Sequence, residues 1–216
     1  GIEVEAHNIS GTELIQKVAQ ESRSGISNAD FIIAQESGRI KGELIDTGYV
    51  ENVIPGGIAD VIPTEYQDPL ALMFITKVFI YNSETYDMPP VKSIWELTEE
   101  PWNGKVFLKD PKQEGVNTDF FTMLTSPEVS QMIEEAYERY YGEPITLTEE
   151  NAGYEWIKAF FENDVVLFNS DTRIAEAIGI KGNDIDTVGL FVYSKLRDRE
   201  AKDLALMPIM GMDPFA

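Results

Sequence analysis

The chain has 216 residues, of which 43% are hydrophobic and 11% aromatic, and this is enough to form one large packed domain or two small ones. Its 38 acidic and 17 basic side chains give a formal net charge of −21, which disfavours binding to nucleic acid or to an anionic membrane surface. Because the chain has no cysteine, disulfides, thiolate metal sites and cysteine nucleophiles are excluded.

The first predicted elements are a strand and a helix. Residues 2 to 6 alternate apolar and charged side chains, which is typical of a half-buried strand. A helix is expected over residues 11 to about 21, because Ser10 and Glu13 have the spacing of a capping box at its start. That structural interpretation of Ser10 is sufficient on its own.

A second strand and helix follow before the alternation stops. Residues 29 to 34 are an apolar, strand-like run, and residues 37 to 46 are expected to form a short helix. Prolines and glycines make residues 47 to 69 a long turn-rich segment. The apolar run of residues 70 to 81 is long enough for an extended strand that crosses between two bodies, and we expect a hinge there.

The second half of the chain again alternates strands with helices, and this pattern predicts an α/β fold with mostly parallel sheets. Strands are expected at residues 105 to 108, 165 to 168 and 188 to 193. Helices are expected after Asn117, from Pro127 to about Gly142, from about 149 to 162 behind a Thr148 cap, and from about Thr172. Tyr140 and Tyr141, at the end of the second of these helices, are interpreted as packing residues.

Both ends of the sequence are abrupt. The chain starts at Gly1 without a methionine and leads directly into the first predicted strand, and it ends in the apolar run from Met210 to Ala216. We therefore expect natural sequence to be missing on both sides. No run approaches the roughly 18 to 20 apolar residues of a transmembrane helix.

Polar residues gather at four predicted strand-to-helix junctions. In α/β proteins ligands bind beyond the carboxyl ends of the strands, where the N–H groups at helix N-termini favour anions. The convergence of four such loops predicts a binding site. The candidate ligand-binding residues are Ser10, Gly11, Thr12, Gln35, Glu36, Ser37, Asn117, Thr118, Asn169, Ser170, Asp171, Thr172 and Arg173.

Arg173 has two interpretations. It falls in the first turn of a predicted helix, where the helix macrodipole disfavours a cation. At that position it can reach a carboxylate or phosphate of a ligand. Alternatively, it is a surface arginine that pairs with Glu176 or with another acid of this acidic chain.

The order of several segments resembles the extracellular solute-binding proteins of bacterial ABC importers, and in particular the group that contains ferric-ion-binding proteins. These segments read "SGTELIQKV", "ADFIIAQESG", "LALMFITKVFIYNS", "KSIWEL", "WNGKVFLKDP", "VVLFNSD" and "MDPFA". The resemblance implies a type II periplasmic-binding-protein-like α/β fold, in which two lobes are joined by crossing strands and hold a solute in the cleft between them. It assigns residues 1 to 76 to an incomplete lobe 1, residues 77 to 204 to lobe 2, and residues 205 to 216 to a return crossing toward lobe 1.

The resemblance also bears on the ligand. Ferric-binding relatives place adjacent tyrosines just after the strand that corresponds to residues 165 to 168, whereas this chain has Asn169, Ser170 and Asp171 there. Hydroxyls, amides, helix N-termini and Arg173 suit a small polar or anionic solute, such as a sugar phosphate, phosphonate or carboxylate, and polyols also fit. Ferric iron or another metal complex is the alternative within the same family.

The implied function is binding without chemistry. The resemblance predicts an extracytoplasmic monomer, in the periplasm or lipid-anchored at the cell surface, which delivers its solute to a membrane permease and needs no cofactor. His7, the single histidine, is interpreted as a strand-end residue and not as a metal ligand, and no nucleophile–base pair is recognisable. Two alternatives of another class are a two-lobed enzyme with an anionic substrate and an effector-sensing domain of a regulator.

Overall fold

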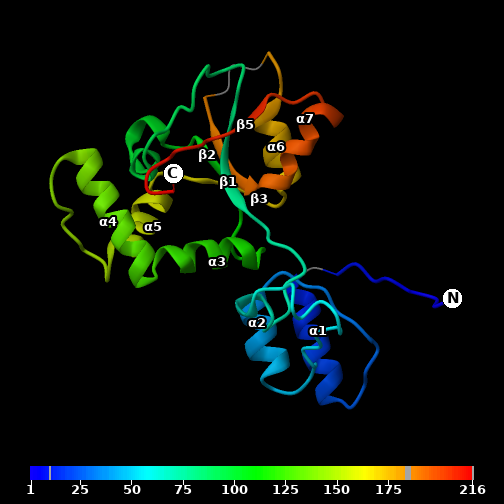
Figure 1. The fold of residues 1–216 in the computed structure, drawn as a ribbon. Coiled ribbons are helices and arrows are strands. Elements are labelled where there is room, and N and C mark those ends of the chain that lie inside the picture. The colour runs from blue at the N-terminus through cyan, green and yellow to red at the C-terminus, as the bar shows by residue number, and fades with distance from the viewer. Residues whose placement is uncertain (10, 183–185, 216) are drawn as a thin grey trace. The chain divides into compact units, whose positions relative to one another are not determined.

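The computed structural model describes residues 1–9, 11–182 and 186–215 (Figure 1). The chain divides into two compact units. Unit 1 contains Gly1–Phe74 and Glu114–Val116, and unit 2 contains Ile75–Gln113 and Asn117–Ala216. Among the described helices, none has the length and apolar character needed to cross a membrane.

Unit 1 is built from helices and loops. Its elements are α1 (Gly11–Arg23), the short α2 (Ser37–Arg39), the π-helix η1 (Ile40–Ile45) and the 3₁₀ turn η2 (Thr64–Tyr66). One face of α1 supplies Ile15, Val18 and Ala19 to a small core that also contains Leu44. The predicted helix at residues 11 to 21 is therefore confirmed, and the helix predicted at 37 to 46 forms as an α turn followed by a π-helix.

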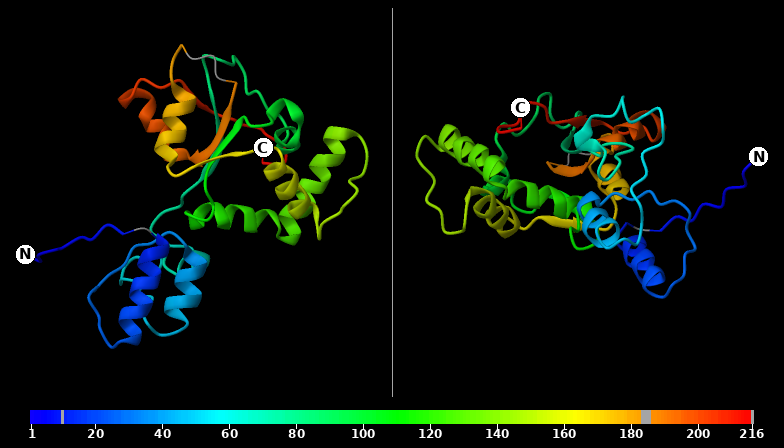
Figure 2. Two further views of the ribbon diagram at one scale, coloured as in Figure 1. Left: turned by 180° about the vertical axis from the view of Figure 1, so that it is seen from behind. Right: turned by 60° about the horizontal axis from the view of Figure 1, so that its bottom comes forward.

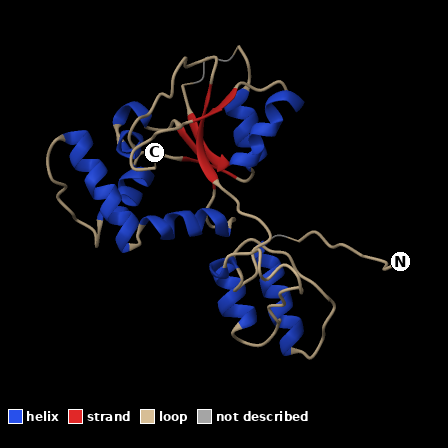
Figure 3. Ribbon diagram, in the orientation of Figure 1, coloured by secondary structure: helices blue, strands red, loops and turns tan. Residues whose placement is uncertain are grey.

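The two strands predicted in unit 1 are wrong, since none of its described residues lies in a strand (Figure 3). Residues 2 to 6 and 29 to 34 are extended but unpaired, with Val4 at 80% and Phe31 at 80% exposure. An alternating pattern marks a face that can be buried, but a strand also needs a neighbour for its backbone hydrogen bonds. The described part of unit 1 offers no such neighbour.

Unit 2 is organised around a five-stranded sheet with the order β3-β2-β4-β1-β5. The strands are β1 (Lys77–Asn82), β2 (Val106–Lys109), β3 (Val166–Phe168), β4 (Val188–Val192) and β5 (Leu206–Pro208). β2 is parallel to β3 and β4, whereas β1 is antiparallel to β4 and β5. The sheet is thus mixed, because β1 runs antiparallel to the four other strands, which share one direction.

Helices cover both faces of this sheet (Figure 2). They are α3 (Gly115–Leu124), α4 (Pro127–Tyr141), α5 (Ala152–Glu162), α6 (Asp171–Gly179) and α7 (Asp198–Ala201), with 3₁₀ turns η3 (Ile94–Thr98), η4 (Glu100–Trp102) and η5 (Tyr193–Arg197). α4 and α5 pack on the face that carries Phe79 and Leu190, and α6 packs on the face that carries Ile80 and Phe191. Neighbouring strand residues therefore enter different cores, as the period of two in a strand requires.

Gly189 of β4 allows α6 to approach the sheet closely. A Cβ atom at this position would overlap with the side chains of Ile174 and Ile178 on α6. The contact fixes the distance of α6 from β4, and with it the place of the helix N-terminus at the edge of the sheet.

Several predicted boundaries in unit 2 need correction. The predicted crossing strand at 70 to 81 is a regular strand only from Lys77 onward, and residues 70 to 74 belong to unit 1. α3 begins at Gly115, before Asn117. Asn151 and not Thr148 caps α5, since its side chain accepts from the N–H groups of Gly153 and Tyr154.

The end of the chain lies with unit 2. The sequence predicts a return crossing to lobe 1 for residues 205 to 216, whereas the structure groups them with unit 2. β5 pairs with β1 there, and the N–H group of Ile94 donates to the carbonyl oxygen of Asp213 at 2.8 Å. Arg139 of α4 adds two hydrogen bonds to the Asp213 carboxylate, at 2.9 and 2.7 Å.

Candidate functional site

The junction between β3 and α6 leaves backbone donors unused. Ser170 is the N-cap residue, and its carbonyl oxygen accepts from the N–H groups of Arg173 and Ile174 at 3.1 and 3.2 Å. In the described part of the chain, the N–H groups of Asp171 and Thr172 have no acceptor. Unused N–H groups at a helix N-terminus, together with the helix dipole, favour a bound anion.

A surface hollow of about 320 Å³ lies beside this junction. It is lined by residues from the carboxyl end of β3, from the first turn of α6 and from the loop after β2, namely Asp110, Gln113, Leu167, Phe168, Asn169 and Arg173. The loop is fixed to the strand because the N–H group of Asp110 donates to the carbonyl oxygen of Phe168 at 2.8 Å. The Asp110 carboxylate accepts hydrogen bonds from the backbone N–H group of Lys112 at 2.9 Å and from the side-chain amide of Gln113 at 3.1 Å.

Arg173 is the cation of this hollow. The pairing with Glu176 considered from the sequence is wrong, because Glu176 accepts from Lys202 at 2.7 Å. Among the residues that the structure describes, Arg173 forms no ion pair. An exposed guanidinium group without a carboxylate partner, in a chain of net charge −21, is available to an anionic ligand.

The two residues before Arg173 are engaged inside unit 2. Asp171 accepts from the Lys77 ammonium at 3.2 Å and from the N–H group of Val192 at 3.3 Å. The Thr172 hydroxyl accepts from the Lys195 ammonium at 2.8 Å. Both were candidate ligand residues from the sequence, and their side chains hold the first turn of α6 instead of facing the hollow.

Asn117 and Thr118 hold the loop between β2 and α3. Asn117 is fully buried and donates to the carbonyl oxygen of Lys109 at 2.5 Å, while its own Oδ1 atom has no partner in the described structure. The Thr118 hydroxyl donates to the carbonyl oxygen of Pro111 at 3.0 Å. Their hydrogen bonds thus shape the loop that carries Asp110 and Gln113.

The candidates in unit 1 form a separate group. The Thr12 hydroxyl donates to the Glu36 carboxylate at 2.8 Å, and Arg39 donates to the same carboxylate at 2.9 Å. A Cβ atom on Gly11 would lie 3.4 Å from Glu36 Oε1, so this carboxylate sits close to the first turn of α1. Gln35 and Ser37 are exposed, and Ser10 with its capping box lies outside the described residues.

The candidate residues chosen from the sequence leave out four residues near the β3–α6 junction. Asp110 and Gln113 line the hollow, and their signal was their position directly after a predicted strand. Lys77 and Lys195 contact the first turn of α6 from β1 and η5. No local pattern marks these two lysines, because Lys77 and Asp171 are 94 positions apart in the chain.

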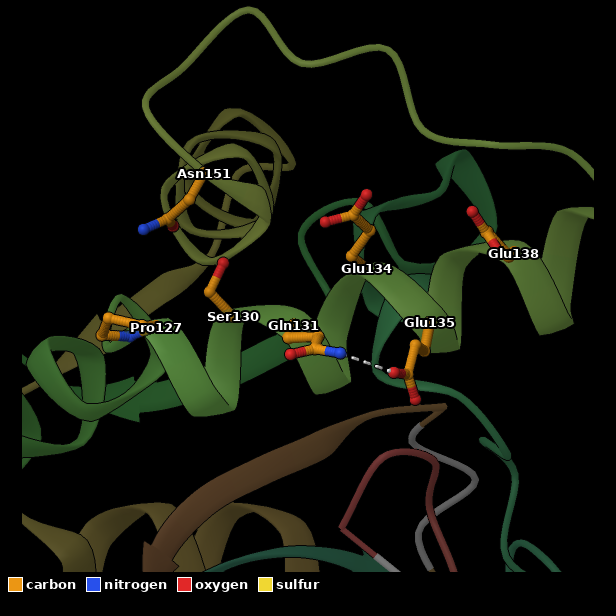
Figure 4. Close-up of a pocket in the computed structure, with 7 residues that line it drawn as sticks. All are labelled: Pro127, Ser130, Gln131, Glu134, Glu135, Glu138 and Asn151. Atoms are coloured by element: carbon orange, nitrogen blue, oxygen red, sulfur yellow. Dashed lines mark hydrogen bonds between the residues drawn. The ribbon is translucent and has the colours of Figure 1, made fainter.

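A larger hollow, of about 540 Å³, is lined by residues of α4 and by Asn151 at the start of α5 (Figure 4). Its polar groups serve the packing of α4 against α5, since Ser130 accepts from the N–H group of Gly153 at 3.2 Å and Asn151 caps α5. Glu134, Glu135 and Glu138 line the rest of it. Its lining has three glutamates and no cation, whereas Arg173 offsets Asp110 in the hollow at the β3–α6 junction, so the larger hollow suits an anion less well.

The adjacent tyrosines of α4 are not arranged as metal ligands. The phenols of Tyr140 and Tyr141 both donate to the Glu99 carboxylate, at 3.1 and 3.0 Å. Burial and then Glu99 raise the pKa of Tyr140 to about 12 and raise that of Tyr141 further. Among the described residues, no group of three or more His, Cys, Asp or Glu side chains is placed to hold a metal ion.

The fold is similar to that of several solved proteins. Iron-bound HitA from Pseudomonas aeruginosa matches with a TM-score of 0.65 and 17% identity over 99% of this chain and 63% of that one. The substrate-binding protein of an ABC transporter from Agrobacterium tumefaciens matches with a TM-score of 0.63 and 15% identity, over 94% of this chain and 56% of that one. The Trichodesmium protein IdiA (FutA), in complex with iron and citrate, matches with a TM-score of 0.59 and 19% identity, over 93% of this chain and 59% of that one.

These similarities establish the fold class that the sequence resemblance predicts, the two-lobed type II periplasmic-binding-protein fold. The chain spans less than two thirds of the length of each of these three proteins. No protein-family model matches the chain, and no curated protein does.

Proposed function

We propose that this chain is the solute-capturing part of an ABC importer and binds a small anionic solute, such as a sugar phosphate, phosphonate or carboxylate. The observation that carries this proposal is Arg173, whose guanidinium group forms no ion pair with any described residue and lies beside two N–H groups of α6 that find no acceptor in the same part of the chain. The solved structures of similar fold support the transport role. In that role the protein acts outside the cytoplasm as a monomer and delivers its solute to a membrane permease.

The chemistry of the junction favours a phosphate, phosphonate or carboxylate group. A guanidinium group donates to two oxygens of such a group at once, and hydrogen bonds of this charge-assisted kind are about twice as strong as neutral ones. Gln113 and Asn169 add amide groups around the same hollow, which suit the hydroxyls of a sugar. A volume of about 320 Å³ is at the small end for ligand sites, so the solute is expected to be small.

Binding without chemistry is favoured over an enzyme. A Ser-His-Asp arrangement would have to use His7, whose side chain is 67% exposed and contacts Glu5 at 3.2 Å. The residues at the β3–α6 junction supply hydrogen-bond donors and a positive charge, which serve to hold an anion. Recovery of a chemically unchanged solute after incubation is the outcome that this proposal predicts, and recovery of a product would overturn it.

A ferric complex is the second candidate ligand, because two of the three similar structures contain iron. Direct iron coordination by the adjacent tyrosines of α4 is disfavoured, because both phenols donate to the Glu99 carboxylate. A ferric complex with a carboxylate chelator such as citrate carries the anionic groups that Arg173 can bind, and it is the form of iron that the junction suits.

Native mass spectrometry of freshly purified protein tests the function first. A retained small molecule, on a protein of 24.3 kDa, identifies both the solute and the monomeric state. Calorimetric titration with inorganic phosphate, citrate and ferric citrate then compares wild type with Arg173→Ala, and Arg199→Ala serves as the control because Arg199 is an exposed arginine of unit 2 away from the hollow. Binding that survives Arg173→Ala would remove the β3–α6 junction as the site.

A further inference from the structure

We propose that Lys77 is a positioning residue for the anion site, acting through Asp171 on the first turn of α6; this inference rests on the proposed function. Lys77 is the first residue of β1, and Asp171 is the first residue of α6. The lysine ammonium lies 3.2 and 3.5 Å from the two carboxylate oxygens. The side chains are 3% and 9% exposed, so this is a buried ion pair.

The pair belongs to a set of contacts that fix the first turn of α6 from three elements. Lys77 lies directly opposite Val192 in the β1–β4 ladder, and the N–H group of Val192 also donates to Asp171, at 3.3 Å. Lys195 of η5 donates to the next residue of the turn, Thr172. Two consecutive side chains of α6 are thereby held by the sheet and by η5, and the third, Arg173, lines the hollow.

The charge of Lys77 has a second consequence for anion binding. The Asp171 carboxylate lies in the first turn of α6, where its negative charge opposes a bound anion. Lys77 neutralises this carboxylate, so that it no longer offsets the positive charge of Arg173, of Lys195 and of the N–H groups at the start of α6. Without Lys77, the buried Asp171 carboxylate would lose its ion-pair partner and would keep only the hydrogen bond from Val192. It would then compete with a bound anion for the N–H groups at the start of α6.

The test is a double-mutant cycle between Lys77 and Arg173, with inorganic phosphate and citrate as the titrated anions. We expect Lys77→Met to raise the Kd by at least about tenfold, and Lys77→Arg to restore binding because it keeps a charged donor for Asp171. If Lys77 acts through the turn that carries Arg173, Lys77→Met raises the Kd by a smaller factor in the Arg173→Ala background than in wild type, and the remaining factor reflects the unpaired Asp171 charge. Equal effects in both backgrounds, or an unchanged Kd in folded Lys77→Met protein, would overturn the proposal.

Hydrogen exchange separates this proposal from the proposed function. If wild type binds neither anion, the function fails, but the positioning role still predicts faster amide exchange at Arg173 and Ile174 in Lys77→Met than in wild type, with exchange in α4 unchanged. Exchange that is the same in both proteins rejects the positioning role. If Lys77→Met does not fold, Lys77→Gln replaces it, since glutamine keeps an N–H donor but loses the charge, and the same two outcomes apply.

Discussion

The ammonium of Lys77 and the carboxylate of Asp171 lie 3.2 Å apart and join the start of β1 to the start of α6. Removing one partner of a buried ion pair leaves an uncompensated charge and typically costs about 3–5 kcal/mol. Chemical denaturation of Lys77→Met should therefore show a loss of free energy of unfolding in this range.

The double variant Lys77→Met/Asp171→Asn is the control for that prediction. It removes both charges while keeping an acceptor for the N–H group of Val192, so most of the lost stability should return. A double variant that is less stable than Lys77→Met alone would show that the cost comes from lost packing and not from the unpaired Asp171 charge.

Arg173→Ala should weaken binding of inorganic phosphate or citrate without destabilising the protein. Charge-assisted hydrogen bonds are worth roughly 1.5 to 3 kcal/mol, and this is the affinity loss expected in a calorimetric titration. The thermal midpoint should not change, because the exposed guanidinium forms no ion pair with any described residue. Arg199→Ala should change neither quantity, and an equal loss with both variants would point to general charge attraction.

The sequence predicted α6 and the β3–α6 junction because their signals are local. The apolar run of residues 165 to 168 marks a strand, and the polar residues after it mark a helix start. The ion pair of Lys77 with Asp171 could not be predicted, because nothing in either segment indicates which distant residue faces it. For the same reason the sequence assigned Asp171 and Thr172 to the ligand, although both side chains are used within unit 2.

The failures in unit 1 have a different cause. Residues 29 to 34 have the composition of a strand, yet Phe31 and Ile33 are 80% and 60% exposed and the segment is unpaired. Composition reports which side chains can be buried, whereas strand formation also depends on a neighbouring strand elsewhere in the chain. The helix α1 needs no such neighbour, since its backbone hydrogen bonds are internal, and its prediction holds.

Gly189→Ala should destabilise unit 2 by pushing α6 away from the sheet. The added Cβ atom meets Ile174 and Ile178, and overpacking of a core typically costs about 1–3 kcal/mol. Thermal or chemical denaturation measures the loss. Gly42→Ala is the matched control, since a Cβ atom at Gly42 meets nothing within 4 Å, and it should leave stability unchanged or slightly raised.

Tyr140 and Tyr141 should ionise later than the other tyrosines when the pH is raised. Burial and the hydrogen bonds to Glu99 raise the pKa of Tyr140 to about 12 and that of Tyr141 further, whereas a free tyrosine has a pKa of about 10. Because the folded-state pKa values lie above the unfolded ones, these phenols stabilise the fold fully below about pH 10, and this stabilisation is lost as the pH rises through the folded pKa values. Tyrosinate absorbance during a pH titration should show a late phase that Glu99→Gln shifts to lower pH, because the substitution removes a negative charge beside both phenols. If that late phase is absent in folded wild type, the two phenols do not share the Glu99 carboxylate.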